Sequence, residues 1–98
     1  MIIRIVKLHF EKENISSFER IFKETREVIR DFKGCRHLEL YQDTVDPSIF
    51  FTYSKWDSEE DLEAYRKSDF FMGVWARTKM LFTEKAEAWS VKHVHSIN

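Results

Sequence analysis

The chain has 98 residues, of which 43% are hydrophobic and 34% charged, with two Gly and one Pro. These values predict one globular domain, residues 1–98, and exclude a disordered or collagen-like chain. Sixteen Lys and Arg against seventeen Asp and Glu give a net charge of -1. Because no positive charge is left over to neutralise phosphates, we expect no nucleic-acid partner.

The hydrophobic residues are not gathered into a membrane span. No apolar run reaches the roughly 18 residues of a membrane helix, so we expect no membrane partner. The chain has one cysteine and begins with the strand-like residues 2–10 rather than with the pattern of a signal peptide. We therefore expect a protein of the reducing cytoplasm.

The first part of the chain predicts a strand, a helix and a second strand. Residues 2–10 are β-branched and apolar, with few polar interruptions. A capping box begins at Ser16, so we expect a helix there, with the Ser16 side chain accepting a hydrogen bond from the amide of Glu19. The helix carries apolar residues at three- and four-residue spacing and ends at Gly34. Residues 35–43 then alternate as in a strand.

The remaining elements are a third strand, an interrupted helical region and a last strand. Turn-forming residues 43–48 precede the β-rich run 49–56, which predicts an antiparallel hairpin with the preceding strand. Capping and acidic residues open a helix near residue 58. Ser68 and Asp69 interrupt or kink it, and a further helical stripe runs to about residue 82. Alternation over residues 84–95 predicts the last strand.

This order, β-α-β-β-α-β, predicts an α+β fold of the ferredoxin-like type, with four antiparallel strands in one sheet and the helices on one face. The other face then lacks a cover, and we expect residues such as Val6, Leu40 and Phe51 to need one. A homodimer in which two sheets meet face to face supplies it. Nine Phe, three Trp and three Tyr also favour an apolar pocket or a subunit interface.

Four motifs carry a resemblance to a known family. They are residues 34–43 (GCRHLELYQD), 46–50 (DPSIF), 53–60 (YSKWDSEE) and 68–71 (SDFF). In these motifs, and in the placing of the first strand and helix, the chain resembles the antibiotic biosynthesis monooxygenase family. The resemblance implies a dimeric α/β barrel that oxidises a small aromatic or quinol substrate with dioxygen. It implies no flavin, haem or metal cofactor, because the substrate anion itself reduces dioxygen.

The sequence departs from the family pattern at several positions. Many members carry Glu two residues before the tryptophan matched by Trp56, where this chain has Ser54. A His is common in the middle of the second helix, where this chain has Tyr65. The haem-degrading branch relies on an Asn, a Trp and a His. The matching positions in this chain are Ile5 or a neighbour, Tyr65 and Trp75, so none of the three is kept and we do not expect haem degradation.

Two residues are candidates for catalysis. Tyr65 lies on the inner stripe of the second predicted helix, where its hydroxyl would orient a substrate oxygen; the alternative is a core tyrosine with a backbone partner. His37 is the first candidate for a general base, since imidazole suits proton transfer near neutral pH. The alternative for His37 is an exposed strand residue beside Glu39.

Four further residues are candidates for substrate binding: Ser54, Trp56, Phe71 and Trp75. At helical spacing the last two also suit plain core packing. We expect no metal site, because His93 and His95 share a strand face but lack a third ligand nearby. Three functions stay open: a monooxygenase, a non-catalytic dimer that binds a small apolar ligand, and a structural dimer whose rings only fill the core.

Overall fold

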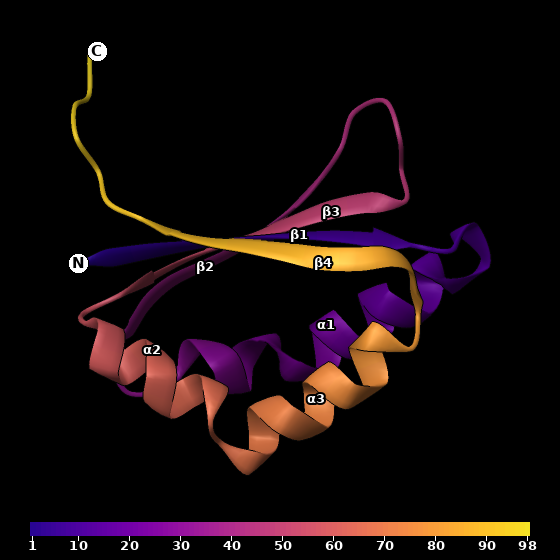
Figure 1. Ribbon diagram of the computed structural model, residues 1–98, viewed down its shortest axis with the longest axis horizontal. Helices are drawn as coiled ribbons and strands as arrows, with labels where there is room; N and C mark the ends of the chain where they lie inside the picture. The colour runs from indigo at the N-terminus through magenta and orange to yellow at the C-terminus, as the bar shows by residue number, and fades with distance from the viewer.

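A computed structural model describes residues 1–98 as one antiparallel sheet with helices packed on one of its faces (Figure 1). The strands lie in the order β2-β3-β1-β4. This is the ferredoxin-like arrangement predicted from the element order. The elements are β1 (Ile2–Phe10), a 3-10 turn (Lys12–Asn14), α1 (Ile15–Arg30), β2 (Cys35–Gln42), β3 (Ile49–Trp56), α2 (Glu59–Arg66), α3 (Asp69–Lys79) and β4 (Phe82–Val91).

The first strand is central and sets the register of the sheet. Ile5 lies opposite Tyr53 on β3 and Trp89 on β4. The pairing of β1 with β4 shifts on either side of His9, as at a β-bulge. The predicted hairpin of β2 and β3 is confirmed as an antiparallel pair. None of the helices is both long enough and apolar enough to cross a membrane.

The core lies between the sheet and the helices and is built mainly of phenylalanine. Leu8, Phe10, Phe18 and Phe50 form one buried cluster. The rings of Phe10 and Phe18 stack with their centroids 4.3 Å apart. This cluster joins β1 and β3 to α1, because alternate residues of a strand point to the same face.

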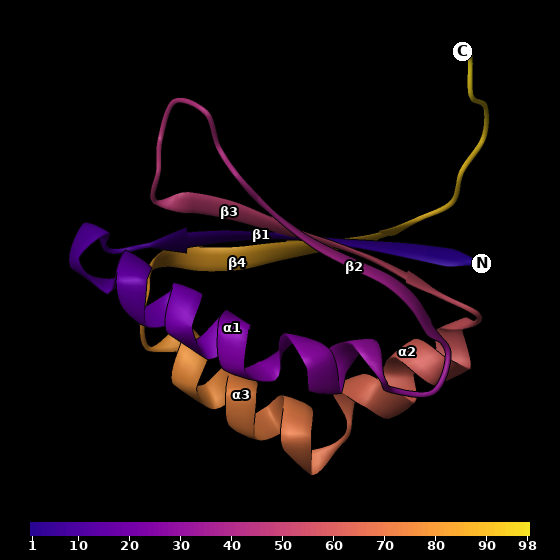
Figure 2. The same cartoon turned by 180° about the vertical axis from the view of Figure 1, so that it is seen from behind.

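The opposite face of the sheet carries no helix (Figure 2). Strand alternation places Phe51 on this open face. Val6 and Leu40, in contrast, pack against the core cluster on the helix side. The expectation that Val6 and Leu40 need a partner subunit as cover is therefore wrong, because they share the strand parity of Leu8 and Leu38, which face the helices.

The capping box at Ser16 is not used, so this prediction is wrong. Helix α1 begins at Ile15, and its N-cap, Asn14, makes no side-chain capping bond. The chain already enters helical geometry through the preceding 3-10 turn, which leaves Ser16 inside the first turn. The Asn14 side chain instead donates to the carbonyl of Leu81, 3.3 Å away. The predicted helix end at Gly34 is close to the observed one, and Gly34 has a φ of +86°, which favours glycine.

The end of the chain differs from the predicted boundaries by a few residues. Ser68 separates two helices and caps α3 by accepting a hydrogen bond from the amide of Phe71. Helix α3 stops at Lys79 and β4 runs from Phe82 to Val91, earlier than predicted. The strand stops there because Val91 already pairs with Ile3, near the start of β1. Residues 92–98 therefore lie outside the sheet.

Candidate functional site

A cavity of about 270 Å³ lies between the helix-covered face of the sheet and the helices. Fifteen of its 21 lining residues are hydrophobic, as expected for a site that takes an apolar ligand. Every strand and every α-helix contributes to its wall. Five of the six predicted site residues line it: Ser54, Trp56, Tyr65, Phe71 and Trp75.

Tyr65 stands at the centre of a cage of aromatic rings. Its ring stacks on Trp56 at 5.0 Å and meets the edge of Phe71 at 5.0 Å. Phe32, from the segment after α1, packs against it at 4.9 Å. These contacts fix the phenol ring, so the position of its hydroxyl is set by packing.

The hydroxyl of Tyr65 is a free hydrogen-bond donor. It forms no hydrogen bond within the chain. Every fully buried polar side-chain atom of the protein has a hydrogen-bond partner, so the Tyr65 hydroxyl, which has none, is not fully buried. Burial, with a smaller contribution from the nearby Cys35, raises the pKa of the Tyr65 phenol far above its usual value. At neutral pH this side chain therefore donates a proton in a hydrogen bond and does not act as a base.

Ser54 and Trp56 lie two residues apart on β3 and point into the same cavity. Both are buried, with 6% and 1% of their surface exposed. The indole Nε1 of Trp56 donates to the Ser54 Oγ over 3.0 Å. The Ser54 oxygen accepts this bond, which leaves its own hydroxyl proton available to a ligand.

Phe71 and Trp75 come from successive turns of α3 and form an aromatic wall. Their rings lie nearly parallel, with an interplanar angle of 9° and centroids 6.0 Å apart. Trp75 also meets the edge of Phe82 at 5.6 Å. Both rings therefore pack in the core and also line the cavity, so core packing and a role in substrate binding are compatible for these two residues.

Two arginines, Arg4 and Arg66, also line the cavity, and neither is among the site residues expected from the sequence. Arg4 lies on β1, opposite Ser54 on β3 and Ser90 on β4. Its Nη1 donates to the Ser90 Oγ over 3.0 Å. Arg66, on α2, lines the same cavity and donates to the Glu63 carboxylate over 2.7 Å.

A signal for Arg4 was present in the sequence. Arg4 has the same strand parity as Val6, Leu8 and Phe10, the side that packs on the helices. A charged residue at an inward position of an apolar strand is unusual unless it has a partner or a function.

The cavity wall contains no side chain that can act as a general base near neutral pH. Its ionisable residues are Arg4, Tyr65 and Arg66, and no Asp, Glu or His lines it. All three donate hydrogen bonds at neutral pH. The arrangement therefore suits the binding and stabilisation of an anion, and not the removal of a proton by the protein. No three His, Cys, Asp or Glu side chains lie close enough together to hold a metal ion.

His37 is not part of this cavity. Its Nε2 is hydrogen-bonded to the Glu39 carboxylate, whose other oxygen accepts from the Tyr41 hydroxyl over 2.7 Å. All three residues lie on the open face of β2, and the ring of Tyr53 packs beside His37 at 6.0 Å. The sheet thus separates His37 from Tyr65 within one chain.

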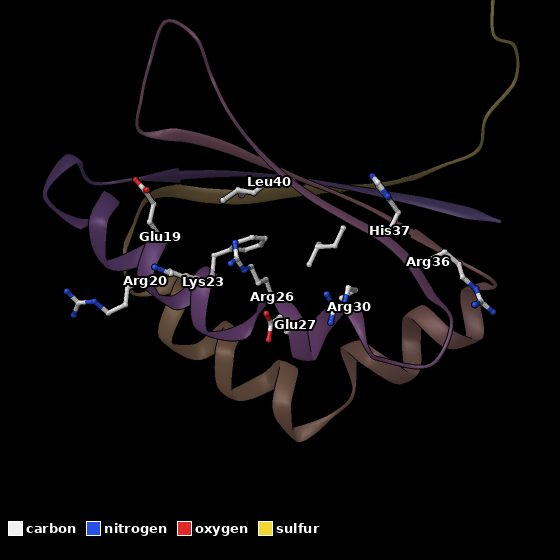
Figure 3. Close-up of a pocket in the computed structure, with 11 residues that line it drawn as sticks. Glu19, Arg20, Lys23, Arg26, Glu27, Arg30, Arg36, His37 and Leu40 are labelled. Atoms are coloured by element: carbon white, nitrogen blue, oxygen red, sulfur yellow. The ribbon is translucent and has the colours of Figure 1, made fainter.

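A second hollow, a groove of about 980 Å³, lies between α1 and the edge strand β2 (Figure 3). Eight of its eleven lining residues are polar or charged, and only three are hydrophobic. Lys23, Arg26 and Arg30 project from the exposed side of α1 along it (Figure 3). This solvated surface does not exclude water, so it does not suit oxygenation of an apolar substrate.

Comparison with known structures shows the same fold throughout the chain. A crystal structure of an antibiotic biosynthesis monooxygenase superposes with a TM-score of 0.90 at 18% identity, covering 97% of this chain and all of that one. A conserved protein of Methanosarcina mazei gives 0.87 at 22% identity, over 94% and 92% of the two chains. A protein of Mycobacterium tuberculosis gives 0.87 at 16% identity, over 99% and 98%.

Sequence comparison gives a family but no close relative. Among curated proteins, none is significantly similar in sequence to this chain. The sequence model of the antibiotic biosynthesis monooxygenase family matches residues 1–73, which is most of the 98 residues. The matched part includes Arg4, Ser54, Trp56 and Tyr65, and the chain belongs to the antibiotic biosynthesis monooxygenase family.

Proposed function

We propose that the protein is a cofactor-independent monooxygenase that oxidises a small aromatic or quinol substrate with dioxygen in the cavity under the sheet. The observation that carries this proposal is an apolar cavity whose ionisable side chains, Arg4, Tyr65 and Arg66, are all hydrogen-bond donors at neutral pH. An apolar substrate that fills such a cavity displaces water from it, and the donors stabilise a substrate oxyanion. An electron-rich oxyanion is the species that reduces dioxygen without a cofactor.

The reaction follows from what the cavity offers and lacks. Because no Asp, Glu or His lines the wall, the substrate hydroxyl releases its proton to solvent water, and the donors around it stabilise the resulting oxyanion. The substrate anion passes one electron to dioxygen, and the radical pair combines into a peroxide at a ring carbon. The peroxide takes up a proton from solvent. Its O–O bond then breaks as the hydrogen of that carbon leaves as a proton, giving a quinone carbonyl and water.

Tyr65 and Ser54 are the residues assigned to substrate orientation in this proposal. The phenol of Tyr65 is held by rings and has no partner in the chain, so a substrate oxyanion is its natural acceptor. The Ser54 hydroxyl is free to donate in the same way. Trp56, Phe71 and Trp75 supply the aromatic surface against which the substrate rings pack.

A homodimer is part of the proposal. The open face carries Ile5 in the centre, with Tyr53 and Trp89 beside it. Trp89 and Tyr41 are 44% and 48% exposed, so large aromatic rings on this face remain in contact with solvent in the single chain. A second copy of the same sheet covers this face through a two-fold axis. We place this dimer in the reducing cytoplasm, where the single Cys35 stays a thiol.

Oxygen uptake by the metal-stripped, flavin-free protein tests the reaction. A panel of reduced quinols and polycyclic phenols should give uptake above the buffer rate. Tyr65→Phe should lower it about 100- to 1000-fold, as expected for the loss of one oxyanion donor. Tyr41→Phe removes a phenol hydroxyl outside the cavity and should leave uptake unchanged. His37→Ala should also preserve it, because His37 lies on the other face of the sheet.

The second candidate function is binding without turnover. It is favoured by the same absence of Asp, Glu and His from the cavity wall, and by Ser54 and Tyr65 at positions where many family members have Glu and His. This function predicts that aromatic ligands bind but that no member of the panel gives uptake. That result, with folded protein, would refute the monooxygenase proposal.

A further inference from the structure

We infer that the cavity selects aromatic ligands that carry a carboxylate, which Arg4 and Arg66 hold at one end. The inference deepens the proposed function and rests on it for the identity of the site, but it concerns ligand binding and not turnover. Both arginines line the cavity that also contains Ser54 and Tyr65. The rest of the wall is mainly hydrophobic.

Arg4 is a partly enclosed cation without an anionic partner. Its side chain forms no ion pair and its one hydrogen bond goes to the neutral Ser90 Oγ. A guanidinium has about five N–H donors, so most of those on Arg4 remain free. Burial, and secondly the nearby Arg66, lower the pKa of Arg4, while Glu63 opposes the change. An enclosed arginine without a partner is costly to the fold, so a ligand anion is the group that this position lacks.

The charges at this end of the cavity match a single negative charge. Arg4 and Arg66 contribute two positive charges, and Glu63, hydrogen-bonded to Arg66 at 2.7 Å, contributes one negative charge. One positive charge is left uncompensated. A carboxylate suits it best, because its two oxygens match the paired N–H groups of a guanidinium.

The donors beside the arginines complete the site. Ser54 lies directly opposite Arg4 across the β1–β3 pair, and its hydroxyl proton is free. An apolar cavity of roughly 150 Å³ is large enough for benzene. About 270 Å³ therefore has room for two fused rings with a small polar substituent. Arg66 is exposed at the rim, so the charged end of the ligand lies towards solvent.

The test compares 2-naphthoate with 2-naphthamide, its neutral counterpart of the same shape. Neither has a phenol hydroxyl, so binding is measured without turnover, by the quenching of tryptophan fluorescence and by calorimetry. We expect 2-naphthoate to bind at least tenfold more tightly to the wild-type protein. Arg4→Gln should remove this preference while leaving the affinity for 2-naphthamide unchanged. Arg66→Gln should reduce the preference, and Arg77→Gln, on the exposed side of α3, should keep it.

Several results would overturn the inference. Equal affinity of the wild type for the two compounds would exclude a carboxylate site, and so would failure of both to bind. An equal loss of both affinities in Arg4→Gln would mean that Arg4 only supports the fold. If Arg4→Gln does not fold, the result for Arg66→Gln decides, since Arg66 is exposed and its replacement leaves the core intact.

Oxygen uptake separates this inference from the proposed function. The substrates are 1,4-dihydroxynaphthalene and its 2-carboxylate, each corrected for uptake in buffer. Selective binding of 2-naphthoate without uptake from either quinol would refute the monooxygenase and support the carboxylate site. Equal uptake from both quinols, with no preference for 2-naphthoate, would support the monooxygenase and refute the carboxylate site.

Discussion

The two faces of the sheet are made from alternate residues of the same strands, yet they have become different chemical environments. On the helix side, Ser54 and Trp56 are buried and share a hydrogen bond. On the open side, Tyr53 and Lys55, the residues interleaved with them, are only partly covered. A shift of one residue in the register would exchange the two sets.

The difference shows what the helices contribute to the site. Tyr65 and Tyr41 are both tyrosines with raised pKa values, but the causes differ. For Tyr65 the main cause is burial, whereas for Tyr41 it is a hydrogen bond to the Glu39 carboxylate. The helix side therefore keeps a donor free for a ligand, while on the open side the donor is already used within the protein.

The largest expected difference between the faces is in stability. Trp56→Ala should lower the free energy of unfolding by about 3 to 5 kcal/mol, because it leaves a cavity in the core. Trp89→Ala removes a ring of the same size from the open face, where 44% of it is exposed. It should cost less than about 1 kcal/mol in the monomer. Urea unfolding at low protein concentration measures the free energy of unfolding of both variants. An equal loss of stability in the two variants would mean that the two faces are equally buried.

The second prediction concerns association through the open face. Ile5→Asp places a charge between Tyr53 and Trp89, in the middle of the proposed interface, where burial of a carboxylate is costly. We expect the dimer to weaken roughly 100-fold, seen in sedimentation as a shift from twice 11.9 kDa towards 11.9 kDa. Met72→Asp adds the same charge to α3 at a residue that is 53% exposed, and should change nothing. A wild-type protein that sediments only at 11.9 kDa would refute the dimer.

The fold was predictable because its signals are local and repeated. The alternation in β2, the apolar spacing in α1 and the glycine at position 34 each specify one element, and together they specify the order. The errors arose where a distant contact decides the outcome. Asn14 is drawn to the carbonyl of Leu81, and no local pattern reports that contact. Likewise, alternation divides each strand into two sets of residues, but it does not say which set the helices cover. For this reason Val6 and Leu40 were assigned to the wrong face.

The candidate site was predictable only where side chains share a buried face. Ser54, Trp56 and Tyr65 come together because each belongs to the inward set of its element. His37 was grouped with them by its chemistry, but its position on β2 places it on the other face. Arg4 and Lys7 lie on opposite faces of the same strand, and the sequence does not say which of these faces the helices cover, so the signal at Arg4 becomes clear only in the fold.

The third prediction uses the raised pKa of Tyr65. An unfolded tyrosine ionises near pH 10, so above this pH the unfolded chain loses a proton that the folded chain retains. The contribution of Tyr65 is thus complete below about pH 10 and is lost as the pH rises, by up to about 1.4 kcal/mol per pH unit. Tyr65→Phe should lose less stability than wild type between pH 9 and pH 11 in urea unfolding. Identical slopes for the two proteins would show that the phenol is not buried.

The smallest expected effect is on the open face, at Glu39. Hydrogen bonds from His37 and, to a lesser extent, from Tyr41 lower the pKa of the Glu39 carboxyl group. A lowered acid pKa stabilises the fold above the ordinary value near 4.3 and loses this contribution as the pH falls. Titration followed by NMR should show the Glu39 pKa rising in His37→Asn, and rising less in Tyr41→Phe. A larger rise in Tyr41→Phe would place the dominant hydrogen bond on the phenol, and the open face would then resemble the helix side in relying on a tyrosine.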